Sequence, residues 1–373
     1  MNFALTADQV MIRDAAQAFL ADESGSAAVR AAMESETGYD AGVWRRIVEL
    51  GWCGIPVAEE HGGLGLGPVE LVLVLEQMGR HLLCAPYFSS VCLAANILSQ
   101  VADNAAHQHY LTGVADGDVR FTAPLPSDVA GWTATPVVAH NEGGWILNGQ
   151  CPPVPDGASA EWLLVFARIE GQARPALFAL PRDTKGVHIT ALPNWDATRR
   201  FARVELQQVR LGCHRVDDPA RMADGLVRAA ALARLAIAAE QLGGAQQCLD
   251  LTVAYTATRK QFGRAIASFQ AVKHRCAEMM VRIEAARSAV YGAAAVAAGA
   301  ATTDARALEC AVARSLASDT FFFCAQEAIQ LHGGVGFTWE YDPQLYFKRA
   351  QASSHWLGGA EVLRESIAQA LVA

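Results

Sequence analysis

A long stretch with few charged residues runs from residue 229 to residue 262 and constrains the fold of the whole chain. Over residues 229–249 only Arg234 and Glu240 are charged, and small side chains fill most other positions. A helix so poor in polar groups is expected to be buried against neighbours on most sides. The stretch ends in a cationic and aromatic cluster, Arg259-Lys260-Gln261-Phe262-Gly263. A functional hypothesis must therefore explain an acid and a basic terminus on one helix.

The composition supports a large core and argues against several classes of partner. The chain has 373 residues, of which 52% are hydrophobic and 18% charged, enough for two or three domains. A net charge of −8 argues against nucleic acid as the main partner. The nine cysteines are scattered and none has metal-ligand spacing, so we expect reduced thiols, no metal and a cytoplasmic location. We expect no signal peptide, and we interpret the alanine-rich run at 288–303 as a buried helix and not a membrane span.

The order of patterns predicts three domains, at residues 1–113, 114–217 and 218–373. The first is predicted to be helical, with helices from Thr6 or Asp8 to about residue 20, and at 40–50, 69–82 and 86–100. The glycine-rich loop at 56–67 does not fit a nucleotide-binding GxGxxG pattern, and we interpret it as a connection between helices.

The middle domain is predicted to be an antiparallel β-barrel or sandwich, because short alternating segments are separated by proline, glycine and aspartate. The predicted strands lie at 133–138, 144–147, 162–166, 176–180, 188–191 and 202–206. The third domain is predicted to be a four-helix bundle, with helices at about 219–259, 266–299, 303–332 and 342–370 and a loop near 332–339. The fold class is therefore mainly α with a central β domain.

Two motifs in the third domain resemble those of the flavin-dependent acyl-CoA dehydrogenase family. Residues 259–270 look like the family's RxxFGxxIxxFQ motif, and residues 330–338 look like its Q-x-HGGxGF turn. The opening Phe3-Ala4-Leu5-Thr6 and the glycine-rich loop also fit, so the resemblance covers nearly the whole chain. It is closest to actinobacterial members that act on CoA thioesters of steroid side chains and are built as heteromers.

The resemblance implies FAD as cofactor, with its diphosphate and adenosine side contacted across a subunit interface. An arginine offers bidentate donors to a diphosphate, and consecutive glycines let backbone N–H groups approach its oxygens. The alternative is that Arg259 complements the helix dipole and the glycines only turn the chain. The cofactor-binding residues implied by the matching motifs are Arg259, Gln261, Phe262, Gln270, Gln330, Gly333 and Gly334, together with Thr122 and Ser127 of the β domain.

The β domain departs from the family pattern in two segments. The family's TEPGAGSD-like stretch corresponds here to residues 121–128, which keep only the Thr, a Pro and the Ser-Asp. Its K-x-W-I-T-N-G-like segment, which covers the isoalloxazine, corresponds to residues 150–157, where three prolines remove N–H donors. These departures lead to a second hypothesis, a non-catalytic partner subunit that completes the FAD site of a related chain.

The catalytic base is also displaced. The position of the family's usual glutamate falls on Gly358, and a second group of members places it where this chain has Ala233, just before Arg234. Glu240 is the remaining candidate, because seven residues bring it to nearly the same side of the helix as Ala233. An apolar setting suits a carboxylate for abstracting an α-proton. The alternative is a buried glutamate hydrogen-bonded to a neighbouring helix, for example to an arginine, with no chemistry.

The leading hypothesis is therefore FAD-dependent α,β-dehydrogenation of an acyl-CoA to the trans-2-enoyl-CoA, with a bulky, steroid-type acyl group. The resemblance implies lipid metabolism, and assembly as an α2β2 heterotetramer with a homologous subunit or as a homotetramer. It also implies electron-transfer flavoprotein as an electron acceptor.

Overall fold

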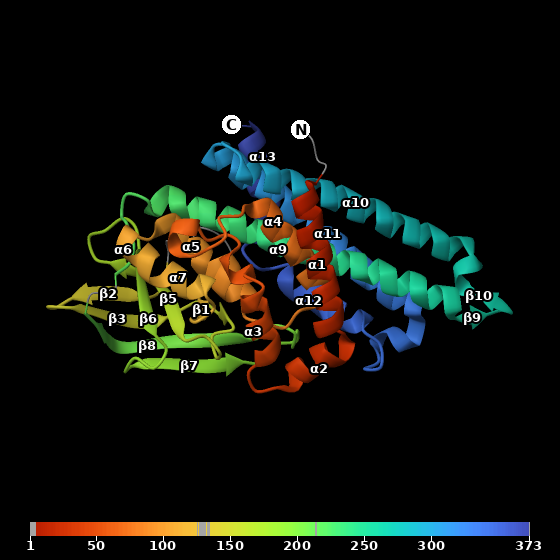
Figure 1. The fold of residues 1–373 in the computed structure, drawn as a ribbon, viewed down its shortest axis with the longest axis horizontal. Helices are drawn as coiled ribbons and strands as arrows, with labels where there is room; N and C mark the ends of the chain where they lie inside the picture. Colours follow the sequence, from red (N-terminus) through yellow and green to blue (C-terminus); the bar gives the residue numbers. More distant parts are fainter. Residues whose placement is uncertain (1–4, 125, 127–131, 133–134, 213–214, 373) are drawn as a thin grey trace.

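The computed structural model describes residues 5–372 except 125, 127–131, 133–134 and 213–214. The molecule is elongated, with a β-sheet at one end and a small β-hairpin at the opposite end of the longest axis (Figure 1). Long helices connect the two ends. Ser127 and the predicted strand residues 133–134 lie outside the described residues.

The N-terminal part is helical, as predicted. Thr6 caps the first helix by a reciprocal pair of hydrogen bonds with Gln9, which satisfies N–H groups that a helix start leaves free. Asp40 caps the third helix in a similar way, whereas the second helix was not expected from the sequence. The elements are α1 (Ala7–Glu23), α2 (Ser26–Glu34), α3 (Ala41–Glu49), η1 (Trp52–Gly54), η2 (Glu59–His61), α4 (Pro68–Arg80), the π-helical η3 (Phe88–Ala95), α5 (Asn96–Val101), α6 (Asn104–Ala106), η4 (His107–Leu111) and α7 (Thr112–Ala115).

The middle part forms one 8-stranded sheet with the path β1-β5-β2-β3-β8-β4, in which β6 also pairs with β5 and β7 with β8. Most pairs are antiparallel, as predicted, but β5 runs parallel to both β1 and β2. Other strands separate both β1 and β2 from β5 along the chain. Neither pair is therefore joined by a tight hairpin, and the longer crossover connections allow parallel pairing. The strands are β1 (Phe121–Thr122), β2 (Val138–Asn141), β3 (Trp145–Gln150), β4 (Val154–Pro155), β5 (Trp162–Ile169), β6 (Ala176–Pro181), β7 (Val187–Leu192) and β8 (Phe201–Leu211).

The C-terminal part is the helical bundle. The predicted helix at 342–370 is wrong in one respect, because two helices form and residues 354–359 separate them. Leu357 and Gly358 have φ angles of 51° and 107°, which a right-handed helix cannot include. The elements are α9 (Met222–Thr258), β9 (Lys260–Gln261), β10 (Arg264–Ala265), η5 (Ile266–Ser268), α10 (Gln270–Ala298), α11 (Thr303–His332), η6 (Gly333–Phe337), α12 (Pro343–Ser353) and α13 (Ala360–Val372).

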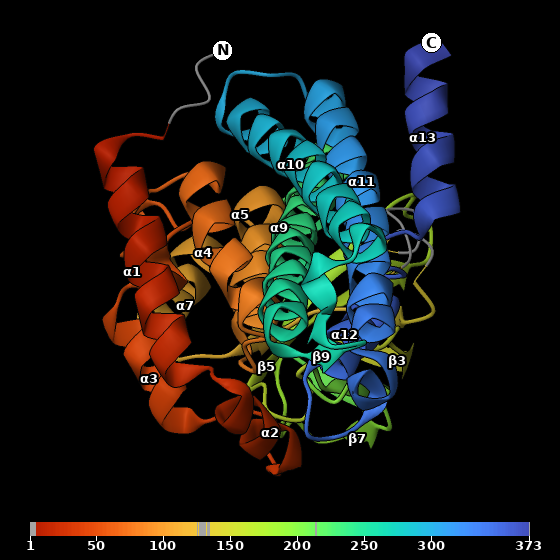
Figure 2. The same ribbon diagram turned by 90° about the vertical axis from the view of Figure 1, so that its right-hand side faces the viewer.

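Helix α9 lies at the centre of the molecule, with α4 on one side and α10 and α11 on the other (Figure 2). Its residues from Ala229 to Ala245 are almost all buried, in agreement with the low charge of the sequence. Two glycines let α9 and α4 touch backbone to backbone. A Cβ atom on Gly243 would stand 1.7 Å from the carbonyl oxygen of Glu76, and one on Gly79 would stand 1.9 Å from that of Glu240. The described part of the chain contains no helix that is long and apolar enough to cross a membrane.

Candidate functional site

The basic end of α9 leads into an exposed hairpin. Strands β9 and β10 pair Gln261 with Arg264, so that Phe262 and Gly263 form a two-residue turn. Both turn residues have positive φ angles, 54° and 76°, as a type I′ turn requires. A phenylalanine in this conformation is strained, and its side chain is 92% exposed. Strain and an exposed aromatic ring at one position are typical of a surface that binds something.

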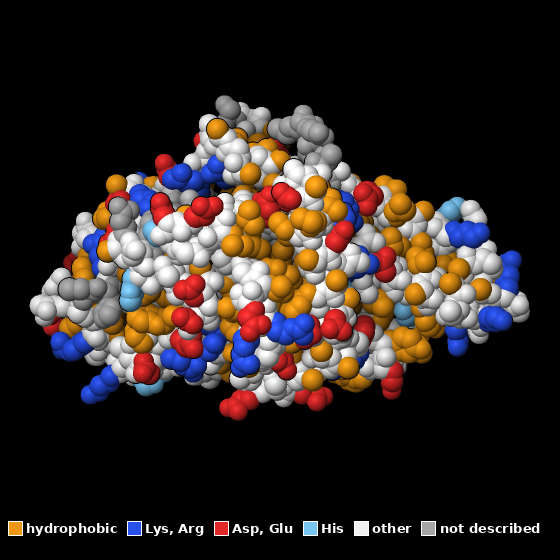
Figure 3. Space-filling model, in the orientation of Figure 1, with side chains coloured by type: hydrophobic (Ala, Val, Ile, Leu, Met, Phe, Trp, Pro, Cys, Tyr) orange, Lys and Arg blue, Asp and Glu red, His pale blue; other side chains and the backbone are white. Residues whose placement is uncertain are grey.

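Positive side chains gather at this end. Arg259, Lys260 and Arg264 are all exposed, and Lys and Arg side chains dominate the right-hand end in Figure 3. The guanidinium of Arg264 is stacked 4.0 Å from the ring centroid of Phe269. Among the described residues, Arg259 forms no ion pair with a carboxylate. The predicted residue Gln270 begins α10, is exposed, and lies 2.8 Å from His274 through its amide nitrogen.

The second motif lies beside the first. The ring of Tyr255, one turn before Arg259, is stacked on His332 with centroids 4.3 Å apart. His332 is buried, its Nδ1–H donates to the carbonyl of Ala328 at 2.6 Å, and burial lowers its pKa. The stacked pair therefore fixes the end of α9 against the end of α11.

The predicted residues Gln330, Gly333 and Gly334 lie on either side of His332 in the chain and are exposed. A Cβ atom on either glycine would meet nothing within 4 Å, so both backbones face open space. The fold thus brings together two motifs that the sequence separates by some seventy residues. An exposed arginine and accessible glycine N–H groups, on two segments joined by the contact between the Tyr255 and His332 rings, fit a diphosphate, the anionic centre of FAD.

The β domain does not fit the flavin ring in the same way. Thr122 is fully buried, and its hydroxyl donates to the carbonyl of Pro155. Pro155 itself is paired with Phe201 of β8, and as a proline it has neither an N–H nor a hydroxyl to offer. The hydroxyl of Thr122 is therefore already used within the β domain and is not free to donate to a flavin.

Glu240 lies inside the molecule and is ion-paired. Its Oε1 accepts a hydrogen bond from Nη2 of Arg199 at 2.8 Å, and the two side chains are 10% and 4% exposed. This agrees with the alternative of a buried glutamate bonded to an arginine, although Arg199 comes from the connection between β7 and β8 and not from a helix. The void beside Glu240 measures about 10 Å³, at the lower limit for one water molecule. A thioester does not fit there in this conformation.

Arg199 is held by more than its partner carboxylate. Its guanidinium lies between two rings, 4.7 Å from the centroid of Phe88 and 4.9 Å from that of Trp356. Burial opposes its charge, but the charge and hydrogen bond of Glu240 outweigh burial and raise the pKa of Arg199.

Two further carboxylates share this buried region. Asp156 accepts a hydrogen bond from Ser89 at 2.8 Å, and burial raises the pKa of Asp156 to about 6. Asp196 accepts a hydrogen bond from Nε of Arg349 at 2.8 Å. The buried network therefore ties the sheet, the π-helical segment and the bundle together.

The two positions of the family's base are structurally unsuited to an acid. Gly358 has a φ angle of 107°, which a glutamate would adopt only with strain. Ala233 is fully buried, and the neighbouring Arg234 donates to the carbonyl of Leu357 at 2.9 Å. The backbone therefore disfavours an acid at position 358, and position 233 carries a buried alanine.

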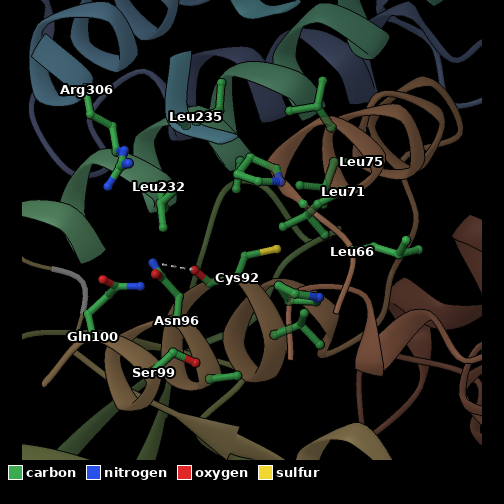
Figure 4. A pocket seen from close by; sticks show the side chains of 18 residues that line it. Leu66, Leu71, Leu75, Cys92, Asn96, Ser99, Gln100, Leu232, Leu235 and Arg306 are labelled. Atoms are coloured by element: carbon green, nitrogen blue, oxygen red, sulfur yellow. Dashed lines mark hydrogen bonds between the residues drawn. The ribbon is translucent and has the colours of Figure 1, made fainter. Parts of the chain in front are cut away.

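An apolar pocket opens between α4, η3–α5 and α9 (Figure 4). Its volume is about 240 Å³, and its walls include Leu71, Leu75, Cys92 and Leu235. Burial, followed by the charge of Glu240, raises the pKa of the Cys92 thiol, so the ion pair lies close behind this wall. Sequence analysis did not identify this pocket, Arg199 or Tyr255, because each depends on segments far apart in the chain.

Comparisons with known proteins agree with these motifs. Residues 6–118 match the N-terminal domain of acyl-CoA dehydrogenases and residues 226–372 match the C-terminal domain. The acyl-CoA dehydrogenase IpdE2 of Mycobacterium tuberculosis is 33% identical over 96% of this chain and 95% of its own length. Its namesake from Mycolicibacterium smegmatis is 32% identical over 95% of this chain and 96% of its own length.

Solved structures of heteromeric enzymes are also similar. The ChsE4-ChsE5 complex of Mycobacterium tuberculosis superimposes with a TM-score of 0.89 at 28% identity, covering 100% of this chain and 99% of that one. A variant of the Tcur3481-Tcur3483 steroid ACAD gives a TM-score of 0.87 at 29% identity and covers 98% of each chain.

Proposed function

Because the chain belongs to the acyl-CoA dehydrogenase family, whose cofactor is FAD, we propose that it acts as a subunit of a heteromeric acyl-CoA dehydrogenase. In this proposal it supplies the diphosphate-binding end of an FAD site to a homologous subunit. The enzyme as a whole oxidises an acyl-CoA to the trans-2-enoyl-CoA, and FAD supplies the hydride acceptor. Two similar structures are named for two different chains, which supports assembly with a homologous subunit, in the α2β2 form that the family resemblance implies.

One observation carries the proposal. Arg259 and the glycines Gly333 and Gly334 are exposed, and no acid of the described residues is paired with Arg259. The stacked rings of Tyr255 and His332 join the two segments that carry them. A flavin bound at these segments would need a β domain from another chain to cover its ring. The hydrogen bond from the Thr122 hydroxyl to the Pro155 carbonyl also supports a flavin ring that is covered by another chain.

The substrate class is proposed on two grounds. The pocket between α4, η3–α5 and α9 is apolar, as an acyl group requires. One similar structure is named as a steroid acyl-CoA dehydrogenase, and this supports a bulky, polycyclic acyl group for the present enzyme.

The first prediction concerns Arg259. Co-expression with homologous chains encoded beside it should give a complex with flavin absorbance that bleaches with a suitable acyl-CoA. Arg259→Gln should weaken FAD retention by about ten- to a hundredfold, because a charge-assisted bond to the diphosphate is lost. The measurement is FAD per complex after gel filtration, together with the dissociation constant of added FAD.

Lys260→Gln is the matched control. It removes the same charge from the next residue, whose side chain points to the other side of the hairpin. Equal loss of FAD in both variants would mean that only net charge matters. If the chain alone, as a homomer, held one FAD per subunit and turned over acyl-CoA, the proposed division between subunits would be wrong.

A second candidate function is catalysis by this chain with Glu240 as the base. The observation in its favour is that the charge of Glu240, after burial, raises the pKa of the thiol of Cys92, which lines the apolar pocket. For this function Glu240 would have to leave Arg199 and turn toward the pocket.

The second prediction separates these roles. If Glu240 is structural, Glu240→Gln leaves Arg199 as a buried charge without its partner and lowers the free energy of unfolding by about 3 kcal/mol, while turnover per folded complex stays unchanged. If Glu240 is the base, turnover at low temperature falls by at least about a hundredfold in a complex that still holds FAD. Denaturant unfolding and single-turnover flavin bleaching measure the two effects. Asp250→Asn, at a half-exposed position on the same helix, is the control.

A further inference from the structure

Polar side chains lie at the rim of the apolar pocket, and a ligand that is only hydrocarbon would leave their hydrogen-bonding groups without partners. At about 240 Å³ it has room for about eight water volumes, or about ten non-hydrogen atoms of a ligand. Arg306 of α11 points toward the pocket from one side, and Asn96, Ser99 and Gln100 of α5 lie across from it (Figure 4).

Two atoms at this rim are buried without a partner. They are Nε of Arg306 and Oδ1 of Asn96. The Asn96 amide is held in place, since its Nδ2 donates to the carbonyl of Ala229 at 2.8 Å. Leaving a buried polar atom without a hydrogen bond costs free energy, so such atoms at the edge of a pocket point to a ligand that satisfies them.

The charge of Arg306 is also uncompensated. Its Nη2 donates to the backbone carbonyl of Gly299 at 3.2 Å, and across the described ranges no carboxylate forms an ion pair with it. The walls beyond it are leucine, valine, alanine and proline side chains, which cannot balance a positive charge. A half-buried guanidinium beside an apolar cavity prefers a carboxylate, which it can bind with two parallel hydrogen bonds.

We propose that this pocket binds an apolar group of about ten non-hydrogen atoms that ends in a carboxylate, with the carboxylate on Arg306. The same chemistry has two sources: a free carboxylic acid, or the far end of an acyl-CoA whose acyl group carries a second carboxylate. If the ligand is the far end of an acyl-CoA, the inference rests on the proposed function and narrows the substrate class. If the ligand is a free carboxylic acid, the inference is independent of the proposed function.

The experiment uses the purified full chain and needs neither flavin nor a partner. Octanoate, which has ten non-hydrogen atoms, is titrated by calorimetry beside octan-1-ol, which has the same chain without the charge. We expect octanoate to bind at least ten times more tightly and to raise the melting temperature. Leu71→Trp, at a half-buried position of the wall, should abolish binding of both probes by filling the cavity.

Variants of Arg306 test whether this side chain binds the carboxylate. Arg306→Gln should weaken octanoate at least tenfold and leave octan-1-ol unchanged, and Arg306→Lys should retain part of the preference. Arg364→Gln, at an exposed arginine paired with Asp319, is the charge-matched control and should change neither.

The two sources are compared with octanoyl-CoA and octanedioyl-CoA. Tighter binding of the latter by at least tenfold, lost in Arg306→Gln, assigns the pocket to the far end of an acyl-CoA. A preference shown only by free octanoate assigns it to a free acid. The inference is overturned if neither pair shows a carboxylate preference, or if Arg306→Gln leaves the preference intact. Loss of FAD in the Arg259 variant tests the proposed function at the other end of α9 and has no bearing on these results.

Discussion

At the scale of single residues, two buried ion pairs join the β domain to the helices. Arg199 with Glu240 and Arg349 with Asp196 are salt bridges whose side chains are at most 10% exposed. Such pairs contribute more to the specificity of the packing than to the stability of the fold. The free-energy cost of removing both charges from water offsets most of their Coulomb attraction. Asp156 differs from them, because its carboxylate accepts a hydrogen bond from the neutral hydroxyl of Ser89.

The pH dependence of stability should therefore carry a contribution from Asp156. Burial raises its pKa to about 6 in the folded chain from an ordinary value of 3.8, so the folded state holds this proton more tightly than the unfolded state. The free energy of unfolding should fall as the pH rises from about 4 to 6, by about 2 kcal/mol. Asp156→Asn should remove this contribution and be the more stable protein at pH 7.

The measurement is urea unfolding of both proteins at intervals between pH 4 and pH 7. Asparagine tolerates the φ angle of 54° at this position, so the substitution does not add backbone strain. Asp183→Asn, at an exposed aspartate, is the control. A difference between wild type and Asp156→Asn that does not change with pH would contradict the expectation.

At the scale of elements, the contact between α4 and α9 determines how the core is built. Gly79 and Gly243 each lie against a backbone carbonyl of the opposite helix, a separation that no side chain permits. Polar groups surround this contact: Glu76 of α4 accepts hydrogen bonds from Arg287 and from the hydroxyl of Tyr291 on α10. The three helices are thus joined by a close backbone contact and by a partly buried ion pair beside it.

Gly243→Ala should destabilise the fold, although replacing glycine by alanine within a helix usually stabilises it. In a free helix alanine is favoured over glycine by about 1 kcal/mol. Here the new Cβ atom would stand 1.7 Å from the carbonyl oxygen of Glu76, so α4 and α9 must separate, and we expect a loss of at least about 3 kcal/mol. Gly299→Ala, where the nearest atom would be 3.5 Å away, should change stability little. Thermal and urea unfolding measure both, and equal stability of the two variants would show that the helices can move apart freely.

At the scale of the whole molecule, α9 joins regions with different roles. Its middle lies beside the apolar pocket and the buried ion pair, and its end carries the exposed cationic hairpin (Figure 1). Exposed aromatic side chains extend from the hairpin to the turn after α11, where Phe337 and Trp339 are 70% and 61% exposed. A surface of this composition is typical of subunit contacts, because aromatic side chains and arginine are enriched there. The assembly and the cofactor site are therefore expected to share this end.

Much of the fold could be predicted from the sequence, because its signals are local. The Thr6 and Asp40 caps, the alternation of the strands and the low charge of α9 each report on residues within one or two turns of each other. The parallel pairings of β5 and the break between α12 and α13 could not be predicted in this way. The first depends on how connections cross the sheet, and the second on positive φ angles at Leu357 and Gly358.

Three features could be read from the sequence alone: the family motifs, the absence of an acid at positions 233 and 358, and the cationic and aromatic character of residues 259–263. Only the tertiary structure decided what Glu240 touches, since Arg199 is 41 residues away along the chain and belongs to another part of the fold. The folded chain also reveals the pocket and, at its rim, Arg306, which has no carboxylate partner among the described residues. The physical reason is the same for both. The sequence identifies a carboxylate or a guanidinium and therefore its chemistry. Its partner depends on how segments far apart in the chain pack together, and no local sequence pattern records that packing.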